Sequence, residues 1–496
     1  MPTKSIHQAQ FGDFQTPIPL AQKIVSILKK NHHLNPDIII EPTCGQGAFI
    51  LAAYQAFTHA TILGFEINPD YVKNSQQLLP DNKQVIVKQA DFFNTDWATI
   101  IASLQGYLLI IGNPPWVTNS ALSVLNSQNI PEKSNFHQQK GIEAITGSSN
   151  FDVSEFILLQ LLHLFTKRDG TLAFLCKYAV ARKVMRRLRK NTIYRLFFSI
   201  YLIDTKKYFS ANVESCLLVV TTDAGDVDCQ VYASLDAPQP DRFIGQREGD
   251  MVSHLYLYEK WRHLRGEESH YIWRSGIKHD CAKIMELEPV NGGYKNGLGE
   301  FIECETDYLY PLLKSSDLAH GDIGVYRKVV IVPQKFVGEN TAVIKKIAPK
   351  TWDYLIRHKE YLAKRKSVIY QNKPEFSIFG VGDYSFKPWK IAISGLYKTL
   401  NFTLVGTLDG KTVLFDDTVN FLSFNTQEEA LFIYALLTSE PALEFFNSII
   451  FWDEKRPITI QLLKRLSLKA LSKELGLFSQ YQRWTEQSQL DMLESR

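Results

Sequence analysis

Short apolar runs alternate with amphipathic stretches through the first half of the chain. The apolar runs predict buried strands over residues 37–42, 61–66, 84–91, 107–115, 171–177 and 215–222. The stretches between them, such as residues 47–57 and 68–79, carry apolar side chains at helical spacing. Continuous apolar strands that are separated by helices are typical of a parallel sheet covered on both faces. The pattern therefore predicts an α/β fold for this half.

The second half of the chain has a different texture. Residues 234–250 mix proline, glycine and charged side chains, which predicts a linker or an exposed connection. The segments that follow combine loops and short strands and are rich in aromatic residues and cations. Helical patterns return over residues 428–451 and 458–471. We therefore predict two domains, residues 1–235 and residues 236–496, of which the second is mixed α+β with a helical C-terminal segment.

Composition narrows the class of protein without selecting one. Hydrophobic residues make up 45% of the 496 residues, which is enough for an ordinary core in each domain. The formal charge of +3 neither requires nor excludes nucleic acid, because acidic surface elsewhere can balance a basic face. Six scattered cysteines without a Cys-x-x-Cys pair argue against a zinc site and fit a reducing cytoplasm. No signal-peptide pattern and no apolar run of about 20 residues is present, so no membrane segment is expected.

Polar side chains follow four of the predicted strands at the points where these strands end. They are Glu41, Glu66, Asp91 and Asn113. The carboxyl ends of parallel strands meet at one edge of a sheet, where α/β proteins bind ligands. An acid at the end of the second strand usually accepts hydrogen bonds from ribose hydroxyls. A single acid of this kind is more often a helix cap, but four residues in chain order predict a nucleotide-type site.

A glycine-rich loop follows the first of these strands in the sequence "EPTCGQGAF", residues 41–49. Gly45 and Gly47 permit a tight turn and a close approach of the backbone to a ligand, just before a predicted helix. The loop lacks the Gly-Lys-Ser/Thr of a phosphate-binding loop and the third glycine of the dinucleotide fingerprint. It therefore belongs to neither of these two motif classes.

Together with "GNPPW" at residues 112–116, this loop resembles the motifs of the S-adenosylmethionine-dependent DNA amino-methyltransferases, which methylate exocyclic nitrogens of adenine or cytosine. The sequence "FGDFQTP" at residues 11–17 is similar to the family's N-terminal cofactor motif. Its position before the glycine loop, with a recognition region at the C-terminus, matches the gamma group, which includes many adenine-N6 enzymes of restriction–modification systems. The resemblance implies a Rossmann-like class I methyltransferase sheet with a separate C-terminal target-recognition domain.

The resemblance also implies S-adenosylmethionine as the cofactor and assigns residues to it. The glycine loop would wrap the methionine part of the cofactor, with Thr16 nearby. Glu66 would hold the ribose, and Asp91 and Phe92 would hold the adenine. The implied cofactor-binding residues are Thr16, Glu41, Gly45, Gly47, Glu66, Ile67, Asp91 and Phe92.

The sequence Asn113-Pro114-Pro115-Trp116 fits methyl transfer to an exocyclic amine. Such an amine is a poor nucleophile, because its lone pair is delocalised into the ring. Two acceptors aimed at its hydrogens would free the lone pair, and the Asn113 side chain and the Pro114 backbone carbonyl can supply them. Proline has a fixed φ and no N–H, so Pro114 and Pro115 form a stiff segment without a backbone donor. No cysteine lies beside this motif, which argues against methylation of a ring carbon.

An amine inside duplex DNA is unreachable, so the target base must flip out at a cost of a few kcal/mol. Trp116 offers a face on which the base can stack, and stacking is worth roughly 1–3 kcal/mol per base. Phe209 matches a family position that contacts the flipped base from elsewhere in the pocket. The predicted catalytic residues are Asn113, Pro114, Pro115, Trp116 and Phe209.

A basic stretch over residues 177–190 predicts a helix on which Arg182, Arg186 and either Arg189 or Lys190 share one face. Phosphate contact and a solvated basic surface are both consistent with this pattern. Residues 273–280, "WRSGIKHD", predict a loop that is suited to base or phosphate contact.

Four functions remain compatible with the sequence. The first is methylation of adenine N6 in double-stranded DNA, as the modification component of a restriction–modification system. The others are methylation of cytosine N4, methylation of a protein glutamine, and DNA recognition without catalysis. Asparagine at the first motif position and the gamma order favour adenine, and the intact motifs argue against loss of catalysis. We expect a monomer without membrane contact, with any cognate endonuclease acting as a separate protein.

Overall fold

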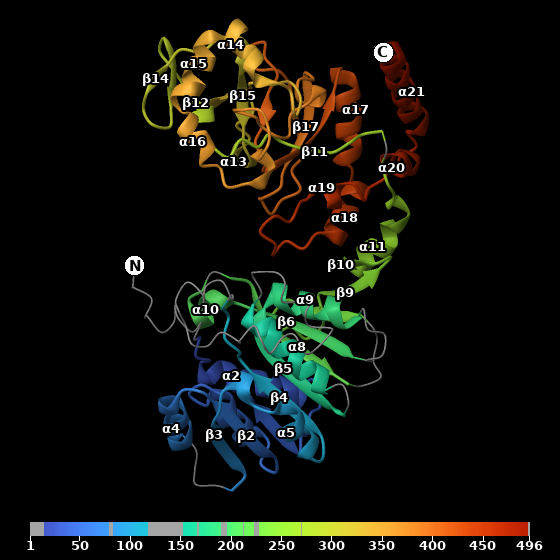
Figure 1. Ribbon diagram of the computed structural model, residues 1–496. Coiled ribbons are helices and arrows are strands. Elements are labelled where there is room, and N and C mark those ends of the chain that lie inside the picture. The colour runs from blue at the N-terminus through green and yellow to red at the C-terminus, as the bar shows by residue number, and fades with distance from the viewer. Residues whose placement is uncertain are drawn as a thin grey trace. The chain divides into compact units, whose positions relative to one another are not determined.

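The chain divides into two units, Met1–Leu255 and Tyr256–Arg496 (Figure 1). The computed structural model describes residues 14–78, 83–117, 152–165, 168–189, 196–211, 213–222, 228–268 and 270–494. The division follows Leu255, whereas the sequence predicted a domain boundary after residue 235. The two positions differ because the strands between residues 229 and 252 pair with the sheet of the first unit.

The first unit is built on a mixed sheet with the strand order β10-β9-β8-β6-β7-β5-β4-β1-β2-β3. All six predicted strands are confirmed and correspond to β1–β5 and β7. The sequence did not predict β6 or β8–β10. The strands are β1 (Ile38–Glu41), β2 (Thr61–Glu66), β3 (Val85–Gln89), β4 (Leu108–Gly112), β5 (Gly170–Lys177), β6 (Phe197–Ile203), β7 (Ser215–Thr221), β8 (Cys229–Tyr232), β9 (Arg242–Arg247) and β10 (Asp250–Val252).

The strand order reverses between β1 and β4, which lie side by side in the sheet. Both pair in parallel, with Ile38 opposite Leu108 and Ile40 opposite Ile110. On its other side β1 pairs in parallel with β2. The carboxyl edge at such a reversal is where open α/β sheets bind ligands. The reversal therefore places the glycine loop after β1 and the Asn-Pro-Pro-Trp loop after β4 at the same edge.

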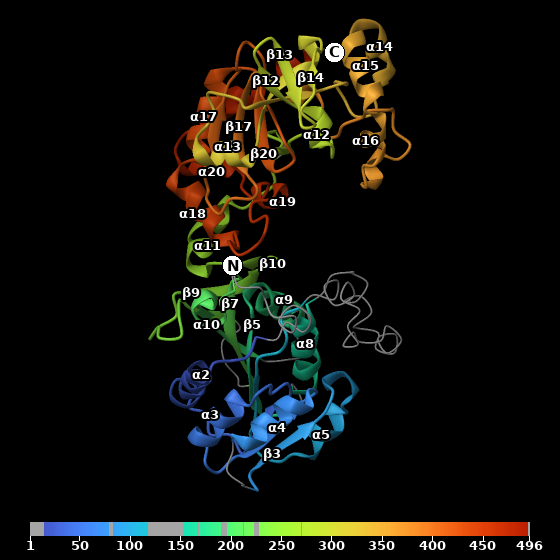
Figure 2. The same ribbon diagram turned by 90° about the vertical axis from the view of Figure 1, so that its left-hand side faces the viewer.

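Helices cover both faces of this sheet. Figure 2 shows α2 (Ile18–Lys30) and α3 (Ala48–Ala56) on one side and α5 (Trp97–Ser103), α8 (Val153–Phe165) and α9 (Tyr178–Arg189) on the other. The other helices that the structure describes in this unit are α4 (Pro69–Gln77) and α10 (Thr205–Phe209). The α/β fold predicted from the sequence is therefore confirmed.

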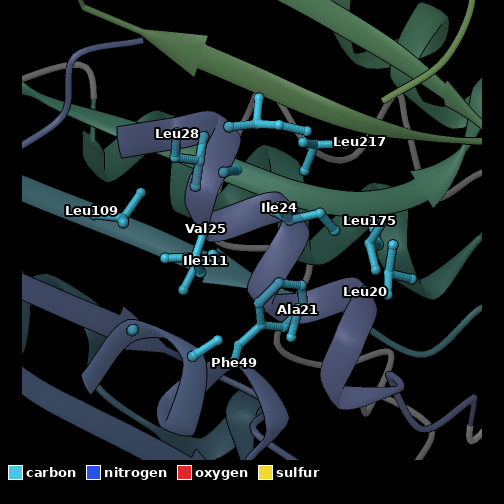
Figure 3. Close-up of a cluster of buried hydrophobic side chains, with 14 of the residues drawn as sticks. Leu20, Ala21, Ile24, Val25, Leu28, Phe49, Leu109, Ile111, Leu175 and Leu217 are labelled. Carbon is cyan, nitrogen blue, oxygen red and sulfur yellow. The ribbon is translucent and has the colours of Figure 1, made fainter. Parts of the chain in front are cut away.

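Helix α2 illustrates how the apolar pattern fixes this packing. Leu20, Ile24, Val25 and Leu28 recur at helical spacing and are at most 1% exposed. Figure 3 shows them against side chains of β4, β5 and β7 and against α3. A fully buried side chain of this size contributes about 1.5–3 kcal/mol. The helix is thus held firmly on the sheet, and it fixes the segment that enters it, Phe14–Pro17, beside the strand ends.

The predicted linker at residues 234–250 is wrong in its second half, because β9 and β10 form a hairpin there. Glu248 and Gly249 have φ values of 50° and 83°, and Arg247 pairs with Asp250 across them. Two central residues with positive φ characterise the type I′ hairpin turn, in which Asn-Gly or Asp-Gly is the usual sequence. Glu-Gly is a weak signal for this turn, and strands of six and three residues carry little periodicity.

The second unit contains two sheets. A four-stranded sheet has the order β11-β20-β17-β18, and a six-stranded sheet has the order β14-β13-β12-β16-β15-β19. The strands are β11 (Arg274–Ser275), β12 (Glu286–Val290), β13 (Gly293–Asn296), β14 (Phe301–Ile302), β15 (Leu309–Leu313), β16 (Lys328–Ile331), β17 (Trp389–Ser394), β18 (Thr403–Val405), β19 (Leu414–Phe415) and β20 (Val419–Phe424).

Helices complete this unit, and the helical C-terminal segment predicted from the sequence is confirmed. Among the described residues, no helix has the length and apolar character needed to cross a membrane. The remaining helices are α11 (Leu255–Trp261), α12 (Ala282–Met285), α13 (Ser315–His320), α14 (Ile344–Ile347), α15 (Pro349–Arg357), α16 (Lys359–Ala363), α17 (Gln427–Leu437), α18 (Glu440–Ile449), α19 (Ile460–Leu463), α20 (Leu468–Glu474) and α21 (Phe478–Glu494).

Candidate functional site

The glycine loop after β1 is closed tightly against helix α4. Gly45 and Gly47 have φ values of 51° and 86°, which glycine adopts without strain. The Ser75 hydroxyl donates a hydrogen bond to the Gly45 carbonyl at 2.8 Å. A Cβ at Gly47 would lie 3.0 Å from the Ser75 Cβ and Oγ. The two glycines are therefore required by conformation and, at Gly47, by space.

Glu66 holds this loop from the end of β2. Its Oε2 accepts from the Gly45 N–H at 2.9 Å, and its Oε1 accepts from the Asn68 N–H at 2.8 Å. The side chain is only 9% exposed. Each carboxylate oxygen can accept a further hydrogen bond, so the pair fits the two hydroxyl donors of a ribose. The adjoining Ile67 is 41% exposed and presents an apolar surface at the same strand end.

Glu41 lies at the end of β1 and is 3% exposed. Burial, together with the negative charge of Glu66, raises the pKa of the Glu41 carboxyl well above its usual range. Its Oε2 has no hydrogen-bond partner within the described part of the chain. A buried polar atom without a partner is costly, so this oxygen fits a donor group of a bound ligand.

Asp91 caps the short 3-10 helix Phe92–Asn94 that follows β3. Its Oδ1 accepts from the Phe93 N–H at 3.0 Å, and its Oδ2 accepts from the Asn94 side-chain amide at 2.6 Å. The Phe92 ring is 5% exposed and packs 5.2 Å from the Trp97 ring. The next ring, Phe93, is half-buried and lies 5.7 Å from Phe156 of α8.

The pair of Phe93 and Phe156 was not predicted from the sequence. The doubled phenylalanine after Asp91 was the available signal, but the spacing does not reveal which of the two rings turns into the core. The structure turns Phe92 inward and leaves Phe93 with Phe156 nearer the surface. An aromatic surface for the adenine of a cofactor is therefore more accessible on Phe93 than on Phe92.

The N-terminal segment reaches both loops at the sheet edge. Residues 11–13 of the predicted motif lie outside the described residues, and Phe14–Pro17 lead into α2. Gln15 accepts a hydrogen bond from the Gln46 N–H of the glycine loop at 3.1 Å through its Oε1. Thr16 is half-buried in this segment. The sequence predicted Thr16 here but missed Gln15.

Asn113 leaves the end of β4 with its two amide atoms in different situations. Its Nδ2 donates to the Phe14 backbone carbonyl at 2.7 Å. Its Oδ1 is buried and has no hydrogen-bond partner among the described residues. The side chain is thus fixed by its donor and keeps its acceptor available for a donor that is not part of this chain.

Trp116 and Phe209 come together although almost 100 residues separate them in the sequence. Their ring centroids lie 5.2 Å apart at an interplanar angle of 61°, and Phe14 packs 5.5 Å from Trp116 and 6.1 Å from Phe209. Trp116 is 5% exposed and Phe209 is 9% exposed, so the rings pack mainly against one another. Pro114 is buried beside them, and Pro115 is half-buried. We call Phe14, Trp116 and Phe209 the aromatic cluster.

The basic face predicted for this helix, whether phosphate-binding or solvated, is wrong at Arg182. This side chain is 5% exposed and lies over the Tyr178 ring at 5.4 Å. Lys183 and Arg187 pair with the buried Glu155 of α8 at 3.6 and 3.1 Å, while Arg186 is exposed. Lys190 and the Arg189 side chain lie outside the described structure. Helical spacing identified a shared face but not that α8 covers part of the helix.

The loop predicted for residues 273–280 is largely structural. Trp273 and His279 are 4% and 7% exposed. Gly276 passes so close to the chain before β20 that a Cβ would lie 2.1 Å from the Asp416 carbonyl oxygen. The Ile277 N–H donates to the Phe415 carbonyl at 2.7 Å, and the Lys278 N–H donates to the Phe379 carbonyl at 2.8 Å. These contacts hold the segment in the interior of the second unit.

Known proteins are similar to this chain over almost its full length. It is 46% identical over 470 residues to the type II methyltransferase M.NspV from Nostoc sp., covering 94% of this chain and 97% of that one. It is 25% identical over 327 residues to the type II methyltransferase M.HincII from Haemophilus influenzae, covering 65% of this chain and 58% of that one. No family model matches.

A solved structure is similar in fold. The chain resembles the type IIL restriction–modification enzyme MmeI, solved in complex with DNA, with a TM-score of 0.52 and 12% identity. The match covers 90% of this chain and 63% of that one. Because it is 46% identical to M.NspV over almost the full length of both chains, this chain belongs to the type II DNA methyltransferases of restriction–modification systems.

Proposed function

We propose that the protein transfers a methyl group from S-adenosylmethionine to the N6 amine of an adenine that is flipped out of double-stranded DNA. The observation that carries this proposal is the Asn113 side chain, whose Oδ1 is buried and without a partner in the described structure beside the aromatic cluster. An acceptor held in this way suits an amine hydrogen, and a planar base suits the neighbouring rings.

The residues at the edge of the sheet fit the cofactor that methyltransferases of this family use. We assign the ribose to Glu66, the methionine part to the loop of Gly45 and Gly47 with Thr16, and a donor group of that part to Glu41. We assign the adenine to Ile67, Asp91 and Phe92, as the family resemblance implies, and we add Phe93, whose ring is more exposed than that of Phe92. When bound, S-adenosylmethionine supplies a methyl group on a positively charged sulfur.

The chain's own residues prepare the amine for attack. The Asn113 Oδ1 and the Pro114 carbonyl each accept a hydrogen bond from one of the two amine N–H groups. These hydrogen bonds draw the nitrogen lone pair out of conjugation with the ring. The stiff Pro114-Pro115 segment offers no backbone donor that would compete for that lone pair. The amine nitrogen would take the methyl group that the cofactor's sulfur gives up, and one amine proton would go to water. Positioning of the amine and the methyl group by these residues would supply most of the rate enhancement.

Stacking holds the base in place. A base on Trp116 would replace part of the contact that Trp116 now makes with Phe14 or Phe209. Stacking worth roughly 1–3 kcal/mol would offset much of the cost of flipping. We also propose that the second unit recognises the DNA sequence and that any cognate endonuclease is a separate protein.

The test is transfer of labelled methyl groups to mixed-sequence DNA, followed by digestion to nucleosides and mapping of the labelled positions. We expect N6-methyladenine within one short sequence motif. Labelled N4-methylcytosine would replace the adenine assignment and leave the amine chemistry standing. Label in a ring carbon or in protein glutamine, with none in an exocyclic amine, would refute the proposal.

A further inference from the structure

The segment Phe14–Gln15 contacts three parts of the site at once. The Phe14 carbonyl accepts from Asn113 Nδ2 at 2.7 Å, and Gln15 Oε1 accepts from the Gln46 N–H at 3.1 Å. The Phe14 ring packs 5.5 Å from the Trp116 ring. Two consecutive residues therefore connect the glycine loop, the Asn113 amide and the aromatic cluster.

The contact with the Phe14 carbonyl matters because an asparagine amide has two nearly isosteric orientations. Rotation by half a turn exchanges Oδ1 and Nδ2. In the rotated state Oδ1 would face the Phe14 carbonyl, so two acceptors would meet, and Nδ2 would face the site. In that orientation the Nδ2 group, which is a donor, cannot accept a hydrogen bond from the substrate amine. The lost hydrogen bond and the new repulsion therefore disfavour the orientation that would be unproductive.

We propose that Phe14–Gln15 is a positioning element: its Phe14 carbonyl selects the orientation of Asn113 in which Oδ1 faces the substrate amine, and its Gln15 side chain ties that carbonyl to the glycine loop. This inference rests on the proposed function of Asn113. Phe14 is a positioning residue, because it acts through Asn113. The packing of its ring against Trp116 and Phe209 keeps the carbonyl in place.

The sharpest test is Asn113→Asp, which is isosteric and puts an oxygen in place of Nδ2. An ionised carboxylate would repel the Phe14 carbonyl, whereas a protonated carboxyl would donate to it and keep its other oxygen as the acceptor. We expect the transfer rate of Asn113→Asp, divided by that of the wild type, to rise at least about tenfold as the pH is lowered from about 8.5 to about 6. A ratio that does not change with pH would overturn the orienting role of Phe14.

A second set of variants tests the ring. Phe14→Ala should lower kcat about tenfold with little change in the KM for the cofactor, and Phe14→Leu should recover most of the loss. Phe57→Leu is the matched control, because Phe57 lies in the buried cluster against which Phe14 packs but makes no hydrogen bond or ring contact with Asn113 in the described part of the chain. It should lower the melting temperature and leave kcat unchanged. If Phe14→Ala also lowers only the melting temperature, Phe14 merely fills space.

A measurement without DNA separates this inference from the proposed function. With ¹⁵N-labelled asparagine, the Asn113 side-chain signal is assigned by its absence from Asn113→Asp. We expect its hydrogen bonded to Phe14 to exchange at least about tenfold more slowly than the side-chain amide of the exposed Asn372. Equal exchange rates would overturn the proposed role of the hydrogen bond between Asn113 Nδ2 and the Phe14 carbonyl. If the Asn113 amide exchanges slowly but the protein methylates no DNA, the proposed function is refuted, and the hydrogen bond from Asn113 to Phe14 still stands.

Discussion

The turn at Gly45 and Gly47 after β1 and the Asn113–Trp116 loop after β4 leave neighbouring strands, but the polar atoms at their centres are hydrogen-bonded to different degrees. The first is closed by hydrogen bonds from Ser75 to the Gly45 carbonyl and from the Gly45 N–H to Glu66. In the second, the Asn113 Oδ1 and the Trp116 Nε1 are buried and lack partners within the described residues.

This difference distinguishes a turn that the chain itself holds in place from a loop that leaves polar atoms available to a substrate. A buried polar atom without a partner costs about 1–3 kcal/mol, so folding alone would not favour two of them in one loop. A protein keeps such unpartnered polar atoms where the substrate supplies the missing hydrogen-bond partner. The turn at Gly45, in contrast, is hydrogen-bonded within the chain before any ligand is bound, although the Glu41 Oε2 and the Thr43 Oγ1 that precede it also lack partners among the described residues. The comparison therefore predicts that the two loops fail in different ways when they are altered.

The largest effect is expected for Asn113→Ala, which removes the acceptor. Methyl transfer should fall by about a thousandfold or more, since loss of one preorganised group at a reacting centre typically costs about 10²–10³ and the amine here loses one of two acceptors. Cofactor affinity, measured by calorimetry, should stay within about twofold, because Asn113 belongs to the other loop. Transfer close to the wild-type rate would remove Asn113 from the mechanism.

The next effect concerns Trp116. Trp116→Ala should lose about 1–3 kcal/mol of base stacking, seen as a drop in kcat/KM for DNA, whereas Trp116→Phe should lose less because a ring remains. Trp116→Phe also removes the Nε1 that has no partner in the described structure, so its melting temperature should be close to that of the wild type. Equal losses of activity in both variants would argue against stacking.

A smaller and different effect is expected for Gly47→Ala. A side chain at φ 86° is strained by about 1–2 kcal/mol and would press on Ser75, so the cofactor dissociation constant should rise about 5–30-fold. Gly249→Ala is the matched control, because Gly249 has φ 83° and no atom of the described chain lies within 4 Å of an added Cβ. Its strain should lower stability but not cofactor affinity. A similar loss of affinity in both variants would mean that the glycine loop has no special role.

The smallest effect is expected for Glu41, the acid of the glycine loop, whose Oε2 has no partner among the described residues. Its raised pKa means that the folded state prefers the protonated form, so stability is lost as the pH rises from about 4.5 toward that pKa. Glu41→Gln has no such loss. The melting temperature of Glu41→Gln minus that of the wild type should therefore grow by a few degrees between about pH 5 and about pH 8. A constant difference would show that the carboxyl titrates normally.

The parts of the fold that the sequence predicted share a cause. Strands β1, β2 and β4 are continuous apolar runs, because both of their faces are buried, and each run ends at a polar residue. That pattern located Glu41, Glu66 and Asn113 at one edge. Strand β9 is mostly only partly buried and the edge strand β10 has three residues, so neither carries this signal, and the sequence predicts a linker where they form a hairpin.

The parts of the site that were missed depend on contacts between distant segments. Nothing in the spacing of residues 14–17 indicates that the Phe14 carbonyl meets Asn113, almost 100 residues further along the chain. Helical periodicity put Arg182 on a basic face, but only packing against neighbouring elements decides that it is buried. The pairing of Trp116 with Phe209 was reached through the family resemblance rather than through periodicity.

The most direct test of the central claim, that the acceptor of the methyl group is an exocyclic amine held by Asn113, uses DNA that lacks only this amine. In an oligonucleotide containing the mapped recognition sequence, purine replaces the target adenine, or 2-pyrimidinone replaces a target cytosine. We predict that the protein still binds this DNA and transfers no labelled methyl group to it, while the unmodified oligonucleotide is methylated. Methylation of the amine-free base would contradict the account.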